Sequence, residues 1–516
     1  MPEEAYLKPE NIKIRQLVND YRMGRIVIPE FQRDYVWKPG KAPKLIDSIY
    51  RDFPIASLLL WQSTDSARAR RTNGRGAYGP ATNWLIDGQQ RVITLARTLS
   101  VDEGLDVVFN PFTDEFSLPN AATRKDPRWF SVASICDDAS YRSVRRDLGD
   151  GRAAQLSQAR LEKVRKILDY EVPMVRMVNH TFEQAVQAFT RINTLGVRLK
   201  QEDIDSARVA ARHSGFIADE VVPYLEKMRR QGFDRLNVMH LFRACAFVAR
   251  PDGRNRTPLH ELSEKEVLQA WKQTQRATDQ ALGLIRGELG LVNMDILWSG
   301  ALIVPLIVLC ATTPPRERDN RALIGWLALA TLLHRYSGSS ETALDQDLKA
   351  CRSTDPVRAL LGNLRQIRSS LAAIPEDFST RLADRSALLA MYIACRHRGI
   401  VDFLGGGTII MQAAVDRHHI LPRGQFPEKH RAIADNIANI AFISGSANRS
   451  INVTGPEVYL KGISPKVLAS QCVPADRALW SIERADEFWT ARRELLADAF
   501  NEFVRQCLPQ RRVAAA

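Results

Sequence analysis

Two adjacent histidines in the C-terminal part of the chain are followed by two asparagines at intervals that suit phosphodiester chemistry. His418 and His419 begin the run HHILP, and Asn439 and Asn448 follow further along. A neutral imidazole can take a proton from water, while a second imidazole and an amide oxygen can hold a cation against a phosphate. These residue types therefore predict a one-metal nuclease site and make DNA the first substrate to consider.

The spacing of these residues predicts the elements that must position them. Residues 408–420 and 439–443 are strand-like runs. A first strand that ends at the histidines, a returning connector, a second strand that begins at Asn439 and a helix that carries Asn448 would form a ββα arrangement. We expect this arrangement to bring His419 and Asn448 to one cleft.

A second polar cluster lies at the end of a predicted strand. The order Asp87, Gly88, Gln89, Gln90, Arg91 leaves this strand and enters a predicted helix. Glycine at such a turn permits close backbone approach, the helix N-terminus presents free N–H groups, and an arginine fork can clamp phosphate oxygens. The turn therefore indicates an anion site, although the same turn is common in ordinary α/β structure. The chain contains no Walker A sequence, which excludes a P-loop nucleotide site.

A short segment ahead of the helix predicted at 41–50 gathers aromatic, amide and guanidinium groups. Its polar and aromatic members are Gln32, Arg33, Tyr35 and Trp37. Such groups can contact a DNA backbone or close a neighbouring site, whereas Tyr35 and Trp37 can equally fill a core. A basic, glycine-rich stretch at 68–79 is expected to be a loop.

The other patterns of the first 200 residues alternate between strand and helix. Apolar residues at helical spacing predict an amphipathic helix at 41–50, and buried strands are predicted at 55–61 and 84–87 as partners. A hairpin is predicted within 105–118, and a capping-box pattern at Thr181 opens a further helix.

The composition permits an anionic partner without requiring one. A chain of 516 residues exceeds what one core usually organises, so roughly two to four domains are expected. Lys and Arg total 72 against 59 Asp and Glu, and the formal charge of +13 favours nucleic acid. The seven cysteines are scattered without C-x-x-C spacing, which argues against a zinc ribbon or disulfide framework and fits a reducing cytoplasm.

The middle of the chain, residues 201–385, has mainly helical periodicity. Residues 296–315 form a charge-free stretch of membrane-spanning length, but Pro305 interrupts it and 321–335 supplies a second apolar helix with which it could pair. We therefore expect a buried helical hairpin and no membrane partner. The acidic N-terminal residues lack an apolar run, so no signal peptide is expected and the localisation is expected to be cytoplasmic.

The two polar constellations together resemble a known enzyme architecture. The runs IPEFQRDYVW, DGQQR and FTRINTLG resemble the N-terminal domain of GmrSD-type modification-dependent restriction enzymes, and the histidine motif resembles HNH, or ββα-metal, endonucleases. The resemblance implies an α+β multidomain chain with an SspE-like order of domains. These would be a ParB/sulfiredoxin-like domain at 8–210, a helical connecting domain at 211–385 and an HNH domain at 386–512.

The same resemblance implies roles for the C-terminal residues. His419 would be the general base, His418 and Asn448 would be metal ligands, and Asn439 would brace the loop that carries the base. His418 stands where many such sequences have an acidic residue, and Asp416 can supply the missing carboxylate. The implied cofactor is a divalent metal, Mg²⁺ or Mn²⁺.

The resemblance further implies a nucleoside triphosphate site and a DNA-sensing segment in the N-terminal domain. Asp87, as a metal or water positioner, and Arg91 would act on the nucleotide. The turn that binds the nucleotide would consist of Gly88, Gln89, Gln90 and Arg91. The residues that read the DNA would be Gln32, Arg33, Tyr35 and Trp37.

The favoured hypothesis is a modification-dependent DNA restriction endonuclease of anti-phage defence. In this hypothesis a sensor domain that hydrolyses a nucleoside triphosphate controls metal-dependent nicking or cleavage of double-stranded DNA. The alternative is a non-catalytic ParB-like DNA-binding regulator with a degenerate HNH domain. A plasmid-cleavage assay with divalent metal separates the two.

Overall fold

The chain folds into two compact units, Met1–Val222 (unit 1) and Pro223–Ala516 (unit 2). The N-terminal domain expected at 8–210 lies inside unit 1, whereas the boundary expected at 385 falls inside unit 2 and stays a prediction. The computed structural model describes residues 4–29, 37–62, 83–100, 105–146, 148, 152–195, 201–213, 215–250, 258–411 and 415–508.

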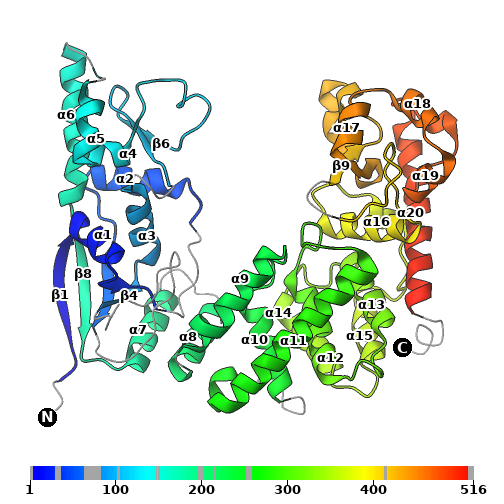
Figure 1. Ribbon diagram of the computed structural model, residues 1–516, viewed down its shortest axis with the longest axis horizontal. Helices are drawn as coiled ribbons and strands as arrows, with labels where there is room; N and C mark the ends of the chain where they lie inside the picture. The colour runs from blue at the N-terminus through cyan, green and yellow to red at the C-terminus, as the bar shows by residue number, and fades with distance from the viewer. Residues whose placement is uncertain are drawn as a thin grey trace. The chain divides into compact units, whose positions relative to one another are not determined.

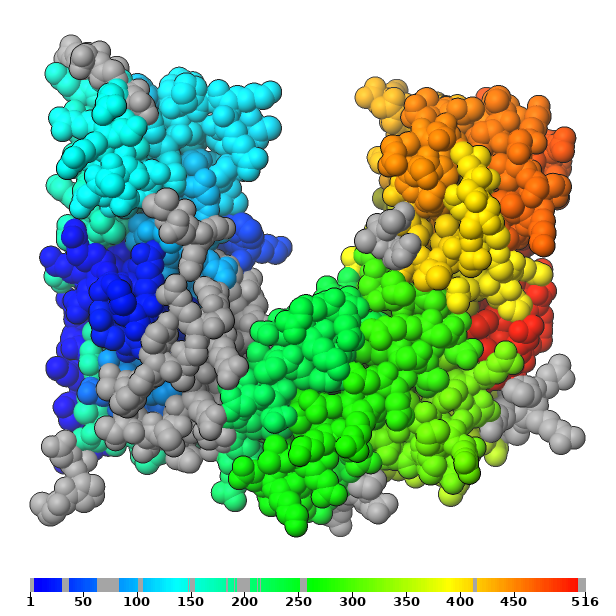
Figure 2. All heavy atoms as spheres, in the orientation of Figure 1, coloured from blue at the N-terminus to red at the C-terminus, as the bar shows by residue number. Residues whose placement is uncertain are grey.

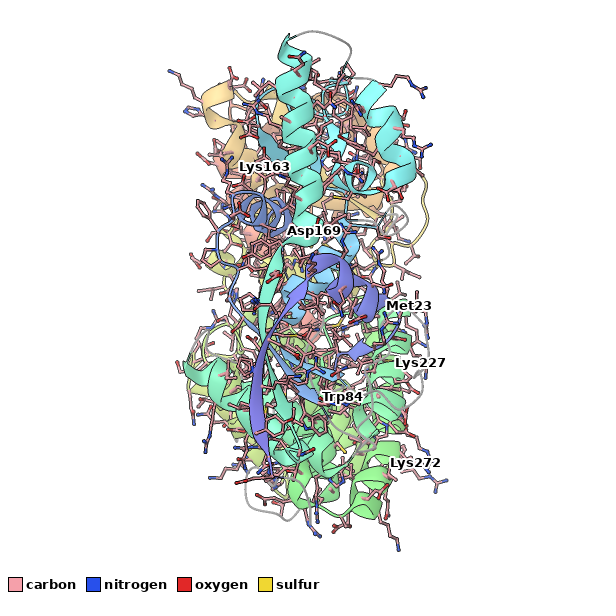
Figure 3. All side chains as sticks on the ribbon, turned by 90° about the vertical axis from the view of Figure 1, so that its left-hand side faces the viewer. Met23, Trp84, Lys163, Asp169, Lys227 and Lys272 are labelled. Carbon is pink, nitrogen blue, oxygen red and sulfur yellow. The ribbon has the colours of Figure 1, made fainter. Side chains whose placement is uncertain are left out.

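Unit 1 is built on a five-stranded mixed sheet with the order β1-β8-β3-β4-β2. β1 pairs with β8 and β3 with β4 in antiparallel fashion, whereas β3 and β8, like β2 and β4, run parallel. Trp61 and Trp84 are buried with their rings 6.1 Å apart, and Figure 3 labels Trp84 within the sheet. The strands are β1 (Tyr6–Lys13), β2 (Ile26–Val27), β3 (Leu58–Gln62), β4 (Asn83–Asp87) and β8 (Glu171–Val178).

Helices and a second, three-stranded sheet complete unit 1 (Figure 1). α1 packs on α3, α2 packs on both α3 and β6, and α4 packs on α6. Lys163 of α6 places its Nζ 4.2 Å from the centroid of the Tyr50 ring at the end of α2. The helices are α1 (Ile14–Arg22), α2 (Lys41–Tyr50), α3 (Gln89–Thr98), α4 (Val132–Cys136), α5 (Asp138–Arg146), α6 (Arg152–Lys166), α7 (Phe182–Leu195) and α8 (Gln201–Arg212). The small sheet consists of β5 (Val108–Asn110), β6 (Glu115–Ser117) and β7 (Phe130–Ser131).

Most elements expected in this unit are confirmed. α2 has the predicted bounds, β3 and β4 are partners, and β5 and β6 form the predicted hairpin. The capping box at the start of α7 is present, because Thr181 N–H donates to Gln184 Oε1 (2.8 Å) and Gln184 N–H donates to Thr181 Oγ1 (3.3 Å). β3 begins at Leu58 rather than at residue 55. The loop expected at 68–79 lies outside the described residues.

Unit 2 begins as a helical assembly. α11 starts with a reciprocal capping box between Ser263 and Glu266 and ends at Gly290, whose φ of 63° suits a left-handed cap. α10, α11 and α12 pack on one another, and α14 packs on α15. The helices are α9 (Val222–Arg230), α10 (Val238–Ala249), α11 (Glu264–Leu289), α12 (Val304–Thr312), α13 (Asn320–Leu332), α14 (Ser340–Ala350), α15 (Pro356–Arg365) and α16 (Arg385–His397).

The apolar stretch at 296–315 is buried as expected, and its 3₁₀ segment Gly300–Ile303 packs on α13, within the predicted partner region 321–335. α12 packs against α10 and α11, whereas α13 packs against α15, α16 and α20. Both helices are apolar around most of their circumference, so each can bury itself among several partners instead of one. Within the described part of the chain, no helix is long and apolar enough to cross a membrane.

The C-terminal part of unit 2 contains a two-stranded antiparallel hairpin followed by a short helix. Figure 2 shows the orange residues of this part gathered at one end of the unit. Arg492 of the last described helix is fully buried and joins two segments of this part, because its guanidinium donates to Ala438 O, just before β10, and to Gln471 O, just after α19, both at 2.9 Å. The elements are β9 (Val415–His419), β10 (Ile440–Ser444), α17 (Gly445–Ile451), α18 (Pro456–Tyr459), α19 (Pro465–Ser470) and α20 (Ala485–Cys507).

Candidate functional site

The β9–β10 hairpin determines where the two histidines point. His418 pairs with Ala441 and His419 pairs with Ile440 across the antiparallel ladder. Because side chains alternate between the two faces of a strand, Asp416 and His418 share one face while His419 lies on the other. The neighbouring imidazoles therefore meet different sets of partners.

His418 belongs to a cluster that also contains residues of β9 and α17. Its Nδ1 lies 2.8 Å from Asn448 Oδ1, and Asn448 Nδ2 donates to Asp416 Oδ2 at 2.9 Å. Only 3% of His418 is exposed, and this burial lowers the pKa of the imidazole to about 4, with the Asn448 bond acting in the opposite sense. The ring is therefore neutral at physiological pH, the state in which histidine binds metals.

Tyr459, from the end of α18, covers the other edge of this ring. Its hydroxyl lies 3.3 Å from His418 Nε2 and donates to Ile420 O at 2.8 Å. The His418 and Tyr459 rings meet edge to face with centroids 5.7 Å apart. Burial raises the pKa of Tyr459 well above its usual value, so the hydroxyl keeps its proton.

The chemistry of this cluster fits a divalent cation. It offers an imidazole nitrogen, an amide oxygen and a carboxylate, and hard cations such as Mg²⁺ prefer the oxygen donors. The 2.8 Å between His418 Nδ1 and Asn448 Oδ1 is close to the roughly 3 Å between neighbouring ligands of an octahedral ion with bonds of about 2.1 Å. No group of three or more His, Cys, Asp or Glu side chains suited to a metal occurs among the described residues. This cluster has two such side chains, His418 and Asp416, and its third member is the amide of Asn448.

His419 lies against a carboxylate from the connector between the strands. Its Nε2 is 3.0 Å from Asp435 Oδ1, and Arg423 Nη1 lies 3.8 Å from the same oxygen. The side chains of His419 and Asp435 are 23% and 30% exposed, so water can reach the pair. No hydrogen bond joins His419 Nδ1 to any residue that the structure describes. This arrangement leaves Nδ1 available as a proton acceptor.

Asn439 is fully buried, and its amide braces the chain just after His419. Its Nδ2 donates to Leu421 O (3.0 Å) and Ala434 O (2.9 Å), and its Oδ1 accepts from Leu421 N–H at 2.9 Å. These bonds tie both ends of the connector together. They are the contacts expected of a brace, and a catalytic contribution of Asn439 stays a prediction.

Sequence reasoning missed Asp435 and Tyr459. Asp435 lies in a 3₁₀ segment, Glu428–Asp435, and Tyr459 lies beyond the strand–strand–helix motif. Neither position belongs to a regular spacing pattern with the histidines. The fold alone brings Asp435 and Tyr459 within hydrogen-bonding distance of the histidines. No signal in the sequence could therefore have found them.

The turn in unit 1 is organised around Arg91. Its Nη1 donates to Ile55 O and Ala56 O (both 2.6 Å), and its Nη2 donates to Ser57 O (2.9 Å) and Asp87 Oδ2 (3.4 Å). Burial lowers the pKa of Arg91, an effect that the nearby Asp87 carboxylate opposes. The N–H groups of the two terminal nitrogens are thus engaged mainly by backbone carbonyls of the segment just before β3. A phosphate clamp by Arg91 stays a prediction that this geometry does not favour.

Gly88 has the geometry that the sequence predicted for the strand-to-helix turn. Its φ is 99°, and an added Cβ would lie 2.2 Å from Leu58 Cδ2 and 3.2 Å from Arg91 Nη2. The next helical residues, Gln89 and Gln90, begin α3, and Gln90 Oε1 accepts from Trp37 N–H at 3.1 Å. The structure therefore joins the predicted turn to the end of the predicted DNA-sensing segment.

Three of the sequence-predicted residues fall outside the described part of the chain. They are Gln32, Arg33 and Tyr35. Their predicted contact with DNA, like the predicted DNA contact of Trp37, stays a prediction.

Comparison with known families is informative for unit 1. A family model described as GmrSD restriction endonuclease, N-terminal domain, matches residues 14–210, which run from α1 through most of α8. No curated protein matches the chain. The N-terminal part is thus similar to a domain of restriction endonucleases, which indicates a function related to DNA restriction with DNA as the substrate.

Proposed function

We propose that this protein is a modification-dependent DNA restriction endonuclease in which the β9–β10–α17 segment of unit 2 cuts DNA. Two facts support the proposal together: the similarity of residues 14–210 to a restriction-endonuclease domain, and the presence of two differently bonded histidines on one hairpin. The single observation that carries it is the His419–Asp435 contact at 3.0 Å, on the same strand as His418, which belongs to a cluster suited to a cation.

His419 is the proposed general base. With Nε2 turned to Asp435, its Nδ1 takes a proton from the water that attacks phosphorus. Arg423, whose side chain is half exposed next to Asp435, stands where it can contact a phosphate of the same strand. Asn439 keeps the connector at Leu421 in place while the base works.

His418 and Asn448 are the proposed metal ligands, with Asp416 beside them. A divalent cation bound there, Mg²⁺ or Mn²⁺, would neutralise charge on the phosphate and on the leaving 3′ oxygen. The protein's part is to keep His418 neutral and to hold the amide oxygen next to its Nδ1. Both conditions follow from the burial and the hydrogen bonds of the cluster.

The test is plasmid cleavage by the full chain with Mg²⁺ or Mn²⁺, comparing wild type with His419→Ala. Loss of a general base costs about a hundredfold to ten-thousandfold in rate. His430→Ala is the matched control, because His430 is exposed on the same connector and makes no side-chain hydrogen bond to a described residue. Equal cleavage by wild type and His419→Ala would remove His419 from the mechanism.

We further propose that unit 1 binds and hydrolyses a nucleoside triphosphate and senses the modification of the DNA. The support is the family match over 14–210 and the Gly88 turn, which opens α3 beside Asp87. Asp87, whose side chain is 37% exposed, carries this proposal further than Arg91, whose terminal nitrogens are already bonded. The expected result is phosphate release by wild type that Asp87→Asn reduces, whereas Asp126→Asn, a change at a partly exposed carboxylate of the same unit that pairs with Arg128, leaves it intact.

A non-catalytic DNA-binding regulator remains the second candidate, and one observation favours it. His418 is only 3% exposed and lies against Asn448 and Tyr459, so a cation would have to enter a buried cluster to reach the ring. In this case the protein binds DNA but leaves plasmid DNA intact at every Mg²⁺ and Mn²⁺ concentration. Metal-dependent cleavage by wild type rejects this candidate.

A further inference from the structure

The hydroxyl of Tyr459 contacts both the His418 ring and the backbone just after His419. It touches Ile420 O, one residue beyond His419, at 2.8 Å and His418 Nε2 at 3.3 Å. A tyrosine hydroxyl has one hydrogen to donate and can accept as well. The carbonyl can only accept, so the hydrogen of Tyr459 goes to Ile420 O.

That assignment limits what His418 Nε2 can do. Because the hydroxyl hydrogen points to the carbonyl, Tyr459 Oη faces His418 as an acceptor, and the matching state of the ring carries its hydrogen on Nε2. In that tautomer Nδ1 is a lone pair. Tyr459 thus favours a ring whose Nδ1 faces Asn448 without a hydrogen.

Asp416 imposes a matching limit on Asn448. An ionised carboxylate only accepts, so the Asn448 group that faces Asp416 Oδ2 at 2.9 Å is the NH₂ group. The amide oxygen is then turned to His418. The result is two lone pairs, on Nδ1 and Oδ1, at a separation of 2.8 Å.

The protein alone cannot satisfy all of these atoms with a neutral ring. Moving the ring hydrogen to Nδ1 repairs the contact with Asn448, but it leaves a buried Nε2 facing an oxygen whose hydrogen is used elsewhere. Protonating both nitrogens would place a charge in a site that is 3% exposed and has no carboxylate bonded to the ring. A cation shared by Nδ1 and Oδ1 removes the conflict.

We infer that Tyr459 and Asp416 are positioning residues that turn the lone pairs of His418 Nδ1 and Asn448 Oδ1 toward one divalent cation. The inference rests on the proposed function and adds two residues to it. Asp416, expected from the sequence as a possible ligand, here acts through the Asn448 amide. Groups that orient metal ligands in this way typically change metal affinity by about 10- to 100-fold when they are replaced.

The experiment measures Mn²⁺ binding by the full chain through the loss of the free-ion electron paramagnetic resonance signal. We expect Tyr459→Phe and Asp416→Asn each to weaken Mn²⁺ binding by about 10- to 100-fold. Plasmid cleavage by Tyr459→Phe should return toward the wild-type rate at saturating Mn²⁺, because the variant retains both ligands and the base.

Tyr224→Phe is the matched control for the loss of a buried hydroxyl. Tyr224 lies on α9, and its hydroxyl contacts Gln275 O and Asp279 Oδ1, both at 3.1 Å, so the variant loses hydrogen bonding of a buried hydroxyl without touching the hairpin. Its Mn²⁺ affinity should equal that of wild type. In the absence of metal, the melting temperature of Tyr459→Phe should fall no further than that of Tyr224→Phe.

The outcomes separate this inference from the proposed function. If wild type binds Mn²⁺ and cuts DNA while Tyr459→Phe and Asp416→Asn bind Mn²⁺ as tightly, the positioning roles are wrong and the nuclease stands. If both variants lose affinity only together with a much larger drop in melting temperature than the control, their role is structural. If wild type neither binds Mn²⁺ nor cuts DNA, the proposed function fails as well.

Discussion

The turn at Asp87–Arg91 in unit 1 and the hairpin at β9–β10 in unit 2 both concentrate residue types suited to phosphate chemistry, yet they use them differently. In the turn, Arg91 donates to three backbone carbonyls and one carboxylate. In the hairpin, His419 is bonded through one ring nitrogen and keeps the other without a described partner. The Arg91 guanidinium stabilises the fold, whereas His419 Nδ1 stays available to accept a proton.

The difference teaches that donor and acceptor accounting distinguishes the two roles better than residue type does. A guanidinium is well suited to phosphate, but its N–H groups serve carbonyls equally well. An imidazole has two nitrogens, so one can be held while the other reacts. In the sequence, both motifs indicate phosphate chemistry. Only the hydrogen-bond partners distinguish a structural role from a catalytic one.

The largest expected effect tests the structural side of the comparison. Arg91→Ala removes the donors of three carbonyls and should lower the free energy of unfolding of unit 1 by about 3 kcal/mol. Arg91→Lys should lose most of the same amount, because a single ammonium cannot reproduce the fork. Urea unfolding monitored in unit 1 measures both variants.

Arg128→Ala is the control for Arg91, since the Arg128 side chain is exposed and bonds only to Asp126 within the part of the chain that the structure describes. It should change stability little. If Arg91→Ala stays as stable as wild type but no longer releases phosphate from a nucleoside triphosphate, the contrast drawn here is wrong and Arg91 is a phosphate ligand.

The next effect tests the chemical side. Asp435→Asn retains the size of the side chain but can place an amide N–H against His419 Nε2, which favours the tautomer with its hydrogen on Nδ1. We expect the cleavage rate to fall about a hundredfold, equivalent to roughly 2.7 kcal/mol, with little change in DNA affinity. Asp498→Asn, an exposed change on α20, serves as control. An unchanged kcat would show that Asp435 does not orient the base.

The smallest effect concerns a histidine whose nitrogen is used for structure. Asn237 N–H donates to His240 Nδ1 at the start of α10, and burial lowers the pKa of His240 to about 4. The unfolded chain therefore binds a proton first, near the ordinary pKa of 6.5. Stability contributed by the neutral ring is complete above about pH 6.5 and is lost as the pH falls toward about 4.

His240→Gln checks this prediction, because glutamine does not titrate and can still accept a hydrogen bond. Urea midpoints measured between pH 7 and pH 4 should fall less steeply for the variant than for wild type. Parallel slopes would mean that protonation of His240 does not govern the acid sensitivity of unit 2.

Local elements were predictable where the signal was local. α2, the β5–β6 hairpin and the capping box at Thr181 follow from residues within a few positions of one another, and the structure has all three. The close approach at Gly88 was also readable, since glycine at a strand-to-helix turn permits it, and a Cβ at this position would lie 2.2 Å from Leu58 Cδ2. The pairing predicted for 296–315 is present through Gly300–Ile303, which packs on α13, whereas α12 packs mainly on α10 and α11 because uniform apolarity gives it no preferred side.

The candidate site was predictable only in part, because its elements follow from local sequence patterns whereas its hydrogen-bond partners come from distant segments. His418, His419, Asn439 and Asn448 lie on elements whose order could be read from the sequence. Their bonding partners come from elsewhere: Asp435 from the 3₁₀ connector and Tyr459 from a helix beyond the motif. In unit 1, the carbonyls that occupy Arg91 lie more than 30 positions earlier in the chain. Contacts of this range depend on the finished fold and leave no periodic trace.

The buried guanidinium of Arg492 bears on the order in which contacts form in a newly made chain. It bonds to Ala438 O, just before β10, and to Gln471 O, just after α19, from a helix that is synthesised after both. A ribosome that has translated His418 and His419 but not residue 492 therefore carries the hairpin without these two bonds. Residues 1–222 are fully synthesised before either bond can form.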